Sequence, residues 1–510
     1  MDERMVVIAP GPTANGDLHL GHLAGPFLAA DICVRYARAT GRDVLFGTGI
    51  HATQNYIVTT ARRLGVRPED LRAGAADQVE KTLVSMGIEA DGFVRFDERY
   101  LHTATEFFRR LHAKGGLRLR PVLFPYSPRT CEYLTDAYVR GGCPFCLAEG
   151  CAGLCENCGH WVASGELIEP RSTLLPDDPL ELRECEVLVL PLEEHRAELV
   201  EYFARQSATM RPRMAQVVDE MLARPLPDYP VTLPISWGIP APFAEVPGQV
   251  IYSDAETVAW SVHCTALCVE GRGGTDGHEL WRRGEDTKVV YFLGSDASSA
   301  FAVVGVAMLL ALGEHVLPDQ FITNEFYELD HDKFSTSRGH LLTARELADI
   351  ASRDLIRFYL AATSPEFQRT NFTREALARV TEWRLVRPWN RVAAKVEQWV
   401  EQGVLPVSAR SRASAARIVE RFAAHYGTRR FSTTSVAFTL TEQLSRLDRW
   451  AVTARDAGDF CHEVEVFLRC ASPILIDLAA EALPDTRIPA RPVATKVTPR
   501  PLPRLIGMTR

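Results

Sequence analysis

The chain has 510 residues, of which 46% are hydrophobic and 24% are charged, and its formal net charge is −8 at pH 7. This composition excludes a disordered chain and a protein that coats nucleic acid over its whole surface, and the length predicts roughly three domains. We find no secretory signal and no apolar run of about 18 residues, so we expect a cytoplasmic protein that stays out of the membrane.

Short apolar strands alternate with amphipathic helices over residues 1–118. Residues 5–10 (MVVIAP) predict a buried strand, residues 44–47 predict a second one, and residues 50–64 lead into a helix. This order is typical of a doubly wound parallel sheet, an α/β fold of the Rossmann type.

A second half of the sheet precedes a long helical region. We expect the sheet to resume near residues 249–252, with strands at 289–294 and 321–324. Beyond about residue 345 the apolar period becomes helical, as in a bundle. The predicted segments are the first half of the Rossmann domain (1–118), an inserted connective domain with paired cysteines (119–232), the second half of the Rossmann domain (233–345), a helical stem and bundle (346–490), and a Pro/Arg-rich tail (491–510).

Four of the twelve cysteines form two CxxC pairs in a glycine-rich stretch. Cys143 and Cys146 make the first pair, and Cys155 and Cys158 make the second. Each pair aims two thiolates at one point, and four thiolates form a closed tetrahedral site for structural Zn²⁺. A redox role for the pairs is the alternative. Cys151 lies between the pairs as a spare, and we expect the other cysteines to be ordinary buried residues.

Two further motifs, more than 300 residues apart, carry chemistry. In residues 14–22 (ANGDLHLGH), His19 and His22 lie three apart at the start of a predicted helix, so they share one face beside free backbone N–H groups that can hold a triphosphate. Residues 333–339 (KFSTSRG) form a hydroxyl-rich loop with Lys333 and Arg338 as cations at its ends. Either motif alone is weak evidence.

In this order and at this separation, the two motifs resemble the signature motifs of class I aminoacyl-tRNA synthetases. With the inserted cysteine knuckles, residues 235–240 (ISWGIP) and the helical C-terminal region, the chain resembles the methionyl-tRNA synthetase family from about residue 5 to residue 400. The resemblance implies an AMP-forming ligase that uses ATP, Mg²⁺ and a structural Zn²⁺ to make an acyl-adenylate from an amino-acid carboxylate. It also implies a C-terminal bundle of the anticodon-binding kind.

The same resemblance assigns roles to residues of this chain. His19 and His22 would contact the ATP phosphates, and Asp296 would hold the ribose hydroxyls. Lys333 would neutralise the leaving pyrophosphate. The expected catalytic residues are therefore His19, His22 and Lys333. The expected ATP-binding residues are Asn15, Gly16, His19, Gly21, His22, Gly294, Asp296, Lys333, Ser335 and Ser337. The expected lining of the substrate pocket is Gly11, Thr13, Gly49, His51, Asp254, Glu256, Ser261 and Phe301.

Some of these positions depart from the family's pattern. Thr336 stands where the family commonly has a second lysine, a loss that can cost about 1.5–3 kcal/mol in triphosphate binding without inactivating the site. Gly49 falls where the family binds the substrate's ammonium with an aspartate, and Gly49 offers only backbone. The nucleotide half of the site is therefore kept, while the amino-acid half is rebuilt.

The side-chain pocket departs furthest from a methionine pocket. Asp254 falls at a tryptophan of the family and Ser261 at a tyrosine, which gives a thioether little to bind. The remaining replacements are Gly11 and Thr13 for a leucine and a tyrosine, and Phe301 for a histidine. With Glu256 as a second acid, the pocket favours a cationic molecule. Alternatively, the comparison of this segment with the family's pocket residues is shifted by one or two residues, and Asp254 belongs to a surface loop.

The evidence for tRNA as a partner is divided. Residues 379–430 carry 11 Lys/Arg against 4 Asp/Glu, and residues 491–510 carry five Lys/Arg and no acid. Such regions suit a polyanion, but a solvated helix face and a loose tail explain them equally well. The helix expected from Trp389 to Trp399 lacks the family's asparagine and arginine arrangement for the anticodon, and Lys395 stands near the asparagine position.

Three functions follow from these observations. The first is a divergent paralog, such as the synthetase-like component of hydrazine synthetases, which transfers an activated acyl group to a small molecule. That acceptor would be the hydroxylamine of an N-hydroxylated lysine in natural-product N–N bond formation, with a cupin partner protein. The second is a methionine–tRNA ligase of translation. The third is a non-catalytic pseudo-synthetase that binds nucleotide or tRNA, which the retained histidines, Asp296 and Lys333 argue against.

Overall fold

The computed structural model describes residues 4–175, 177–333 and 342–508, except for the side chains of Asp332 and Lys333. Its central sheet has five parallel strands in the order β17-β16-β1-β2-β3. Their bounds are β1 Arg4–Ile8, β2 Val44–Gly49, β3 Gly92–Val94, β16 Thr287–Gly294 and β17 Gln320–Asn324. The chain winds outward from β1 in both directions, which is the strand order of a doubly wound fold. The predicted α/β class is confirmed.

Alternate residues of β1 enter different hydrophobic cores, because successive side chains of a strand point to opposite faces. Val6 and Ile8 pack in one core, and Met5 and Val7 pack in the other. Helices cover both faces, so the strand reads as a continuous apolar run. The Met5 face is covered by α2 (Leu28–Ala39), α3 (Tyr56–Leu64) and α4 (Pro68–Ser85), and the Val6 face by α5 (Glu98–Ala113), α8 (Thr257–Gly271) and α9 (Gly305–Leu312).

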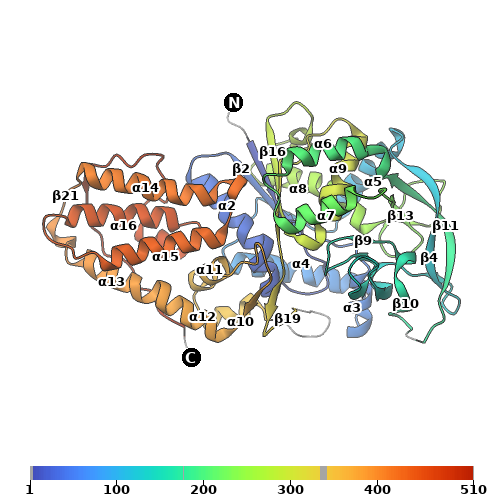
Figure 1. Cartoon of the computed structure of the whole chain (residues 1–510), viewed down its shortest axis with the longest axis horizontal. Coiled ribbons are helices and arrows are strands. Elements are labelled where there is room, and N and C mark those ends of the chain that lie inside the picture. Colours follow the sequence, from blue (N-terminus) through green and yellow to red (C-terminus); the bar gives the residue numbers. More distant parts are fainter. Residues whose placement is uncertain (1–3, 176, 334–341, 509–510) are drawn as a thin grey trace.

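The chain leaves the central sheet after α5 and builds a lobe at one end of the molecule, with β4 and β11 at its outer edge (Figure 1). Its four-stranded antiparallel sheet has the order β12-β11-β4-β5, and a smaller sheet, β10-β6-β7, lies beside the β8–β9 hairpin. The bounds are β4 Arg118–Ser127, β5 Glu132–Tyr133, β6 Val139–Gly142, β7 Glu149–Cys151, β8 Gly153–Leu154, β9 Trp161–Val162, β10 Ile168–Ser172, β11 Glu181–Pro191, α6 Arg196–Gln206, α7 Pro212–Leu222 and β12 Asp228–Pro230.

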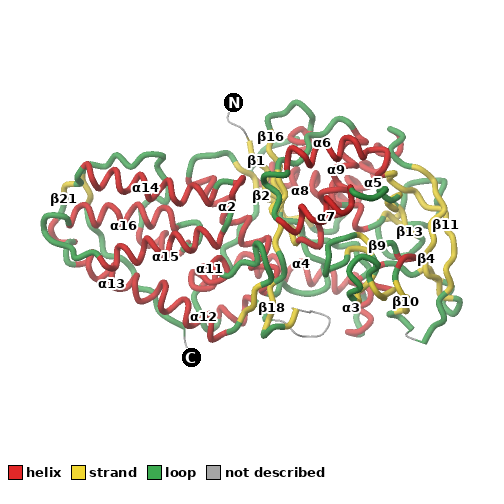
Figure 2. The backbone as a smooth tube through the Cα atoms, viewed as in Figure 1, coloured by secondary structure: helices red, strands yellow, loops and turns green. Residues whose placement is uncertain are grey.

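Helices form a long arm at the opposite end of the molecule (Figures 1 and 2). Ser408 and Ser432 cap two of them, because each hydroxyl accepts a hydrogen bond from a backbone N–H in the first turn. In chain order, the helices of this region are α10 Ala344–Ala348, α11 Arg353–Ala362, α12 Arg374–Thr381, α13 Arg387–Glu397, α14 Ala409–Tyr426, α15 Thr433–Arg449, α16 Ala457–Ala471 and α17 Ile476–Ala482. Short strands accompany them: β18 Tyr327–Leu329, β19 Asp332–Lys333, β20 Thr370–Phe372, β21 Leu405–Pro406 and β22 Lys496–Val497.

The structure corrects two sequence-based expectations. Residues 249–252 do not rejoin the parallel sheet, because β15 (Val250–Ile251) pairs antiparallel with β13 (Thr232–Leu233) and β14 (Ile239–Pro240). The helical stretch Ser295–Leu312 is apolar enough to cross a membrane by length and composition, contrary to the expectation. Of this stretch, 72% is made up of residues buried inside the protein, as in a core helix. Polar residues at its start, such as Asp296, interrupt the apolar run in the sequence.

Candidate active site

Three neighbouring strands end at one edge of the sheet and bring both halves of the sequence together. β1 ends at Ile8 between β2, which ends at Gly49, and β16, which ends at Gly294. Ligands of open α/β sheets bind outside the carboxyl ends of the strands, where the winding reverses. The segment after β1 carries the paired histidines and the segment after β16 carries Asp296, so both predicted nucleotide-binding segments lie at this edge.

His19 and His22 stack on each other at the start of the first helix. Their ring centroids are 3.8 Å apart and their planes differ by 16°. His19 immediately precedes the short helix α1 (Leu20–His22), which continues through a π-helical segment into α2, so the spacing of three places both rings on one side. This arrangement agrees with the predicted common face.

The described residues at both ends of the second motif lie near the same edge. Lys333 ends β19 and pairs through its backbone with Glu328 of β18. After the loop, Thr343 forms an isolated β-bridge with His19, and the N–H of Leu20 donates to the carbonyl of Leu342 at 3.1 Å. The side chain of Lys333 and all of Ser335, Thr336, Ser337 and Arg338 lie outside the described residues.

Other residues of the nucleotide half hold the turn in place. Asp17 accepts from the N–H of Leu18 at 2.7 Å and from the Thr82 hydroxyl at 2.9 Å, so its carboxylate shapes the loop. A Cβ at Gly294 would lie 2.3 Å from Oδ1 of Asp296, so glycine lets this carboxylate take its position. Asp296 and the predicted Asn15, Gly16 and Gly21 are all partly exposed at this edge.

Gly49 lies where the backbones of two strands nearly touch. A Cβ at this position would be 2.4 Å from the carbonyl oxygen of Val94 in β3, closer than atoms can approach. Gly11 is equally confined, because its Cβ would lie 2.5 Å from the carbonyl of Gly49. This backbone arrangement has no room for a carboxylate side chain at position 49, so an ammonium group would need another partner.

A chain of polar side chains runs inward from this edge. Thr13, which bridges to His51 through its backbone, donates a hydrogen bond to Gln54. Gln54 donates to Oδ1 of Asp254 at 3.0 Å, and the Tyr252 hydroxyl lies 3.2 Å from Oδ2. Asp254 is only 6% exposed. It is therefore an interior residue, and the alternative that placed it in a surface loop is wrong.

The inserted lobe contributes a second acid to this network. Oδ1 of Asp136 accepts from the Tyr252 hydroxyl at 3.0 Å, and that hydroxyl accepts from Nε1 of Trp161 at 3.2 Å. Burial and the nearby Asp254 raise the pKa of Asp136 from 3.8 to about 8. Asp136 also has a positive φ of 44°, a backbone conformation that is uncommon for residues other than glycine.

Glu256 is the most deeply buried acid of the pocket. It is 0% exposed, and its Oε2 accepts from the Tyr100 hydroxyl at 2.5 Å. Burial raises its pKa from 4.5 to about 8, against the opposing effect of Tyr100. The Thr53 hydroxyl also lowers this pKa, and Oε1 of Glu256 has no hydrogen-bond partner of ordinary geometry.

The other predicted pocket residues differ in what they offer a ligand. Nε2 of His51 lies 3.0 Å from the carbonyl oxygen of Ser253, and burial lowers the pKa of this histidine while Asp254 raises it. Ser261 is fully buried and its hydroxyl donates within α8 at 2.7 Å. Phe301 is partly exposed and packs against Tyr291 with ring centroids 5.7 Å apart.

Sequence reasoning missed four members of this network. They are Gln54, Tyr100, Asp136 and Tyr252, which come from four different segments of the chain. The sequence contains no spacing pattern that connects them, because their contacts form only when the segment after β2, α5, the inserted lobe and the segment before α8 meet. A buried tyrosine two residues before Asp254 was the one local signal available.

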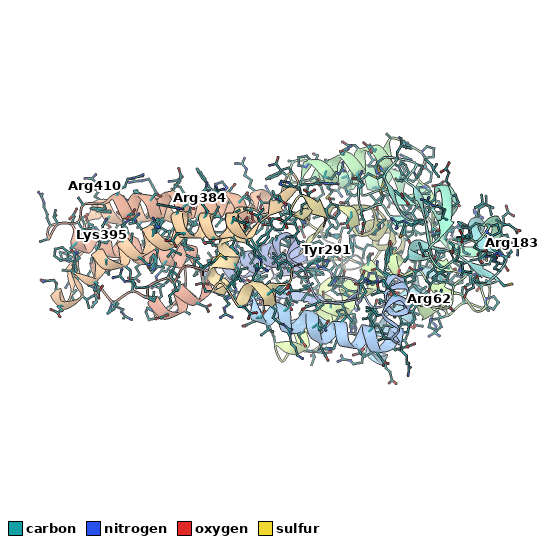
Figure 3. The ribbon with its side chains drawn as sticks, turned by 90° about the horizontal axis from the view of Figure 1, so that it is seen from below. Arg62, Arg183, Tyr291, Arg384, Lys395 and Arg410 are labelled. Atoms are coloured by element: carbon teal, nitrogen blue, oxygen red, sulfur yellow. The ribbon has the colours of Figure 1, made fainter. Side chains whose placement is uncertain are left out.

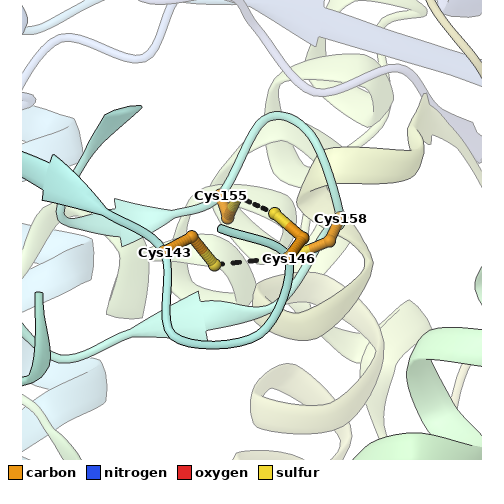
Figure 4. Close-up of side chains that lie close together, drawn as sticks. All are labelled: Cys143, Cys146, Cys155 and Cys158. Atoms are coloured by element: carbon orange, nitrogen blue, oxygen red, sulfur yellow. Dashed lines mark hydrogen bonds between the residues drawn. The ribbon is translucent and has the colours of Figure 1, made fainter. Parts of the chain in front are cut away.

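The four CxxC cysteines converge in the inserted lobe (Figure 4). Their sulfur atoms all lie within 4.8 Å of one another, with 3.8 Å between Cys143 and Cys158 and 3.7 Å between Cys146 and Cys155. Sulfurs about 2.3 Å from a tetrahedral zinc are about 3.8 Å apart, so the cluster fits Zn²⁺. These separations are too long for disulfides. Contrary to expectation, Cys131 is exposed.

Polar side chains of α13 are bound within the chain. Nδ2 of Asn390 donates to the carbonyl of Leu505 at 2.9 Å, and its Oδ1 accepts from the Leu505 N–H at 2.9 Å. Arg391 pairs with Asp448 at 2.7 Å, and Lys395 donates to carbonyls at the end of α15. The C-terminal segment therefore covers part of this helix.

Three labelled basic residues of the arm lie away from the central sheet. Figure 3 shows Arg384, Lys395 and Arg410 on the helical arm, well separated from Tyr291 of β16. Elsewhere on the arm, Arg387 and Arg421 are paired with glutamates. Part of the positive charge that the sequence concentrates in residues 379–430 is thus compensated inside the arm.

Comparisons with known proteins agree on one family. The family described as tRNA synthetases class I (M) matches residues 5–396. The methionine–tRNA ligase of Bacteroides fragilis is 32% identical over 375 residues, and that of Salinibacter ruber is 33% identical over 387 residues. Each match covers 73% of this chain and 54% of the relative, so the chain spans about half the length of these curated relatives.

Solved structures share the fold. The structure of Mycobacterium tuberculosis methionyl-tRNA synthetase bound by methionyl-adenylate superimposes with a TM-score of 0.76 at 18% identity, covering 99% of both chains. The free form of the same enzyme gives a TM-score of 0.67.

Proposed function

The chain belongs to the class I tRNA synthetases of the methionyl type, and from this membership we propose that it is an ATP-dependent ligase that activates an amino-acid carboxylate as an acyl-adenylate. The single observation that carries the proposal is the stacked pair His19–His22 at the carboxyl edge of β1, beside the segment that follows β16. Mg²⁺ would accompany ATP, and the four cysteines would hold a structural Zn²⁺.

In the first step, a carboxylate oxygen attacks the α-phosphorus of ATP in line. The bond from that phosphorus to the pyrophosphate oxygen breaks, and pyrophosphate leaves. His19, His22 and Lys333 would donate to the phosphate oxygens, where negative charge builds up, and Asp296 would hold the ribose hydroxyls. Class I chemistry of this kind needs positioning and charge stabilisation more than covalent help.

We propose that the activated amino acid is not methionine. The lack of room for a carboxylate at Gly49 supports this, because a buried ammonium needs a charged or multiply bonded partner. The polar chain from Thr13 through Gln54 to Asp254 supports it as well, since a thioether gains little from such groups.

We propose a small-molecule acceptor, an amine or the hydroxylamine of an N-hydroxylated lysine, with a cupin partner protein. The acceptor nitrogen or oxygen would attack the acyl carbon, lose a proton and release AMP. The coverage of α13 by the C-terminal segment supports this over tRNA, since Asn390 and Arg391 are already bound within the chain. The second candidate is a methionine–tRNA ligase, which the sequence matches favour.

Pyrophosphate exchange with a panel of amino acids tests the activity. We expect exchange with an amino acid other than methionine, and we expect His22→Ala and Lys333→Ala each to lower it by about 10²–10³-fold. The exposed His102 of α5 provides a matched control, because His102→Ala should leave the rate unchanged. Normal exchange in both site variants would overturn the assignment.

Binding of tRNA separates the two candidate functions. A tRNA ligase makes many phosphate contacts, so its binding weakens steeply with salt. We expect no tRNA binding tighter than the non-specific range of about 10⁻⁴–10⁻⁶ M at physiological salt. Specific charging of tRNA with methionine would establish the second candidate instead.

A further inference from the structure

Several buried carboxylates of this chain have a guanidinium partner. This is the usual arrangement, because an ionised carboxylate is costly to bury alone. The pairs are Asp31 with Arg357 at 2.6 Å, Glu366 with Arg211 at 3.5 Å, and Glu463 with Arg446.

Asp136, Asp254 and Glu256 are different. They are 8%, 6% and 0% exposed, and they accept hydrogen bonds from the hydroxyls of Tyr252 and Tyr100 and the amide of Gln54. The Thr135 and Thr53 hydroxyls also lower the pKa values of Asp136 and Glu256. No lysine or arginine whose side chain is described forms an ion pair with any of the three. Three buried acids therefore gather without a lysine or arginine partner among the described side chains, and a bound cation would favour their ionised forms.

The three acids share one place in the fold. Asp136 and Asp254 both contact the hydroxyl of Tyr252, at 3.0 and 3.2 Å. Glu256 follows Asp254 by two residues at the start of α8 and has a fully buried Oε1 with no hydrogen-bond partner of ordinary geometry. That oxygen is an open acceptor, and an unsatisfied buried acceptor of this kind requires an explanation.

The network also reaches the site edge. Gln54 connects Asp254 to Thr13, and both Gln54 and Thr13 are partly exposed. A molecule bound between the paired histidines and Thr13 would therefore meet the acids on its inner side.

We propose that Asp136, Asp254 and Glu256 form an ammonium subsite, which binds the second ammonium group of a diamino acid. An ammonium has three donors and a positive charge, so charge-assisted hydrogen bonds to it favour the ionised forms of these acids. The inference rests on the proposed function for the identity of the pocket. It adds the substrate class and gives the inserted lobe a direct role through Asp136.

Calorimetric titration of the full chain with L-lysine, L-norleucine and L-methionine tests the subsite. Norleucine has the chain length of lysine without its second ammonium. We expect lysine to bind at least about 10-fold more tightly than norleucine or methionine. Asp254→Asn and Glu256→Gln should bring the lysine-to-norleucine ratio close to one. Asp178→Asn, which alters a buried acid that bonds to Ser127 in the inserted lobe, should leave the ratio unchanged.

The outcomes separate this inference from the proposed function. Norleucine or methionine binding as tightly as lysine overturns the subsite, and this comparison needs no variant to fold. A ratio that survives in both Asp254→Asn and Glu256→Gln also overturns it. Lysine binding without pyrophosphate exchange for any amino acid would leave the subsite standing and overturn the proposed activity.

Discussion

Gly49 is a position where the backbone itself dictates the residue. Its Cβ would lie 2.4 Å from the carbonyl oxygen of Val94, and both atoms belong to strands of the central sheet. We expect Gly49→Ala to lower the free energy of unfolding by about 1–3 kcal/mol, because overpacking forces neighbouring strands apart. Urea denaturation of the two proteins measures the difference.

Gly74 of α4 provides the matched control. It is exposed, and a Cβ there meets nothing within 4 Å. Gly74→Ala should therefore stabilise the protein by up to about 1 kcal/mol, as alanine does in helix interiors. Equal stability of Gly49→Ala and the unaltered protein would contradict the close approach of β2 and β3.

Glu256 gives the stability of the protein a pH dependence of known sign. Its pKa is about 8 in the folded chain against 4.5 ordinarily, so over this interval the folded state keeps a proton that the unfolded state releases. Stability is then lost as the pH rises through the interval. Glu256→Gln removes this titration. As the pH is raised from about 5 to about 8.5, the free energy of unfolding of the variant should therefore increase relative to that of the unaltered chain, on the order of 1–3 kcal/mol.

Chemical denaturation at both pH values provides the measurement. The control for this measurement is Asp178→Asn, which alters a buried acid outside the cluster. A difference between Glu256→Gln and the unaltered chain that stays constant with pH would show that Glu256 titrates normally in the folded protein.

At the scale of elements, the two CxxC turns of the inserted lobe bring their four sulfur atoms together at one point. We predict about one zinc per chain with Zn–S distances near 2.3 Å, measurable by elemental analysis and X-ray absorption. Cys143→Ser should lose the metal and destabilise the lobe, because a small, loop-rich segment depends on its metal for stability.

Cys151→Ser is the control for the knuckles. Cys151 is half-buried between the two pairs but does not belong to the group of four sulfurs within 4.8 Å. Its variant should keep the full zinc content. Full zinc in Cys143→Ser would rule out the proposed ligand set.

At the scale of the whole molecule, one arginine ties the arm to the sheet domain. Arg357 of α11 is 1% exposed and donates to Asp31 of α2 at 2.6 Å. It also donates to the carbonyls of Met86, Pro473 and Ile474. Removal of Arg357 leaves these three carbonyls without their donor and leaves Asp31 with only the partly exposed Arg35 as its partner. We expect Arg357→Met to cost about 3–5 kcal/mol of stability, measured by urea denaturation.

Arg353, one turn earlier on α11, is the control. Its pair with Asp477 is largely exposed, so Arg353→Met should cost no more than about 1 kcal/mol. Similar losses in the two variants would contradict a buried junction at Arg357.

We also propose that residues 1–118 and 233–345 form one catalytic domain, interrupted by the insertion 119–232 and followed by the stem and bundle (346–490) and the tail (491–510).

The sequence alone determined the features that depend on near neighbours. Apolar runs predicted β1, β2, β16 and β17 to within a few residues, because a strand covered on both faces needs apolar side chains throughout. Spacings of three residues predicted the common face of His19 and His22 and the convergence within each CxxC pair. The sequence-based expectation failed at residues 249–252, where an apolar run of similar length forms a separate small sheet.

Only the tertiary structure decided the contacts between distant segments. It placed Asp136 of the inserted lobe against Tyr252, buried Glu256 on Tyr100, and brought Leu505 onto Asn390. It also closed the space beside Gly49. These three hydrogen bonds join single atoms more than 100 residues apart and leave no period in the sequence. They depend on how whole strands and helices pack, so the part that Asp136 plays in the pocket and the cover of α13 were visible only once the chain had folded.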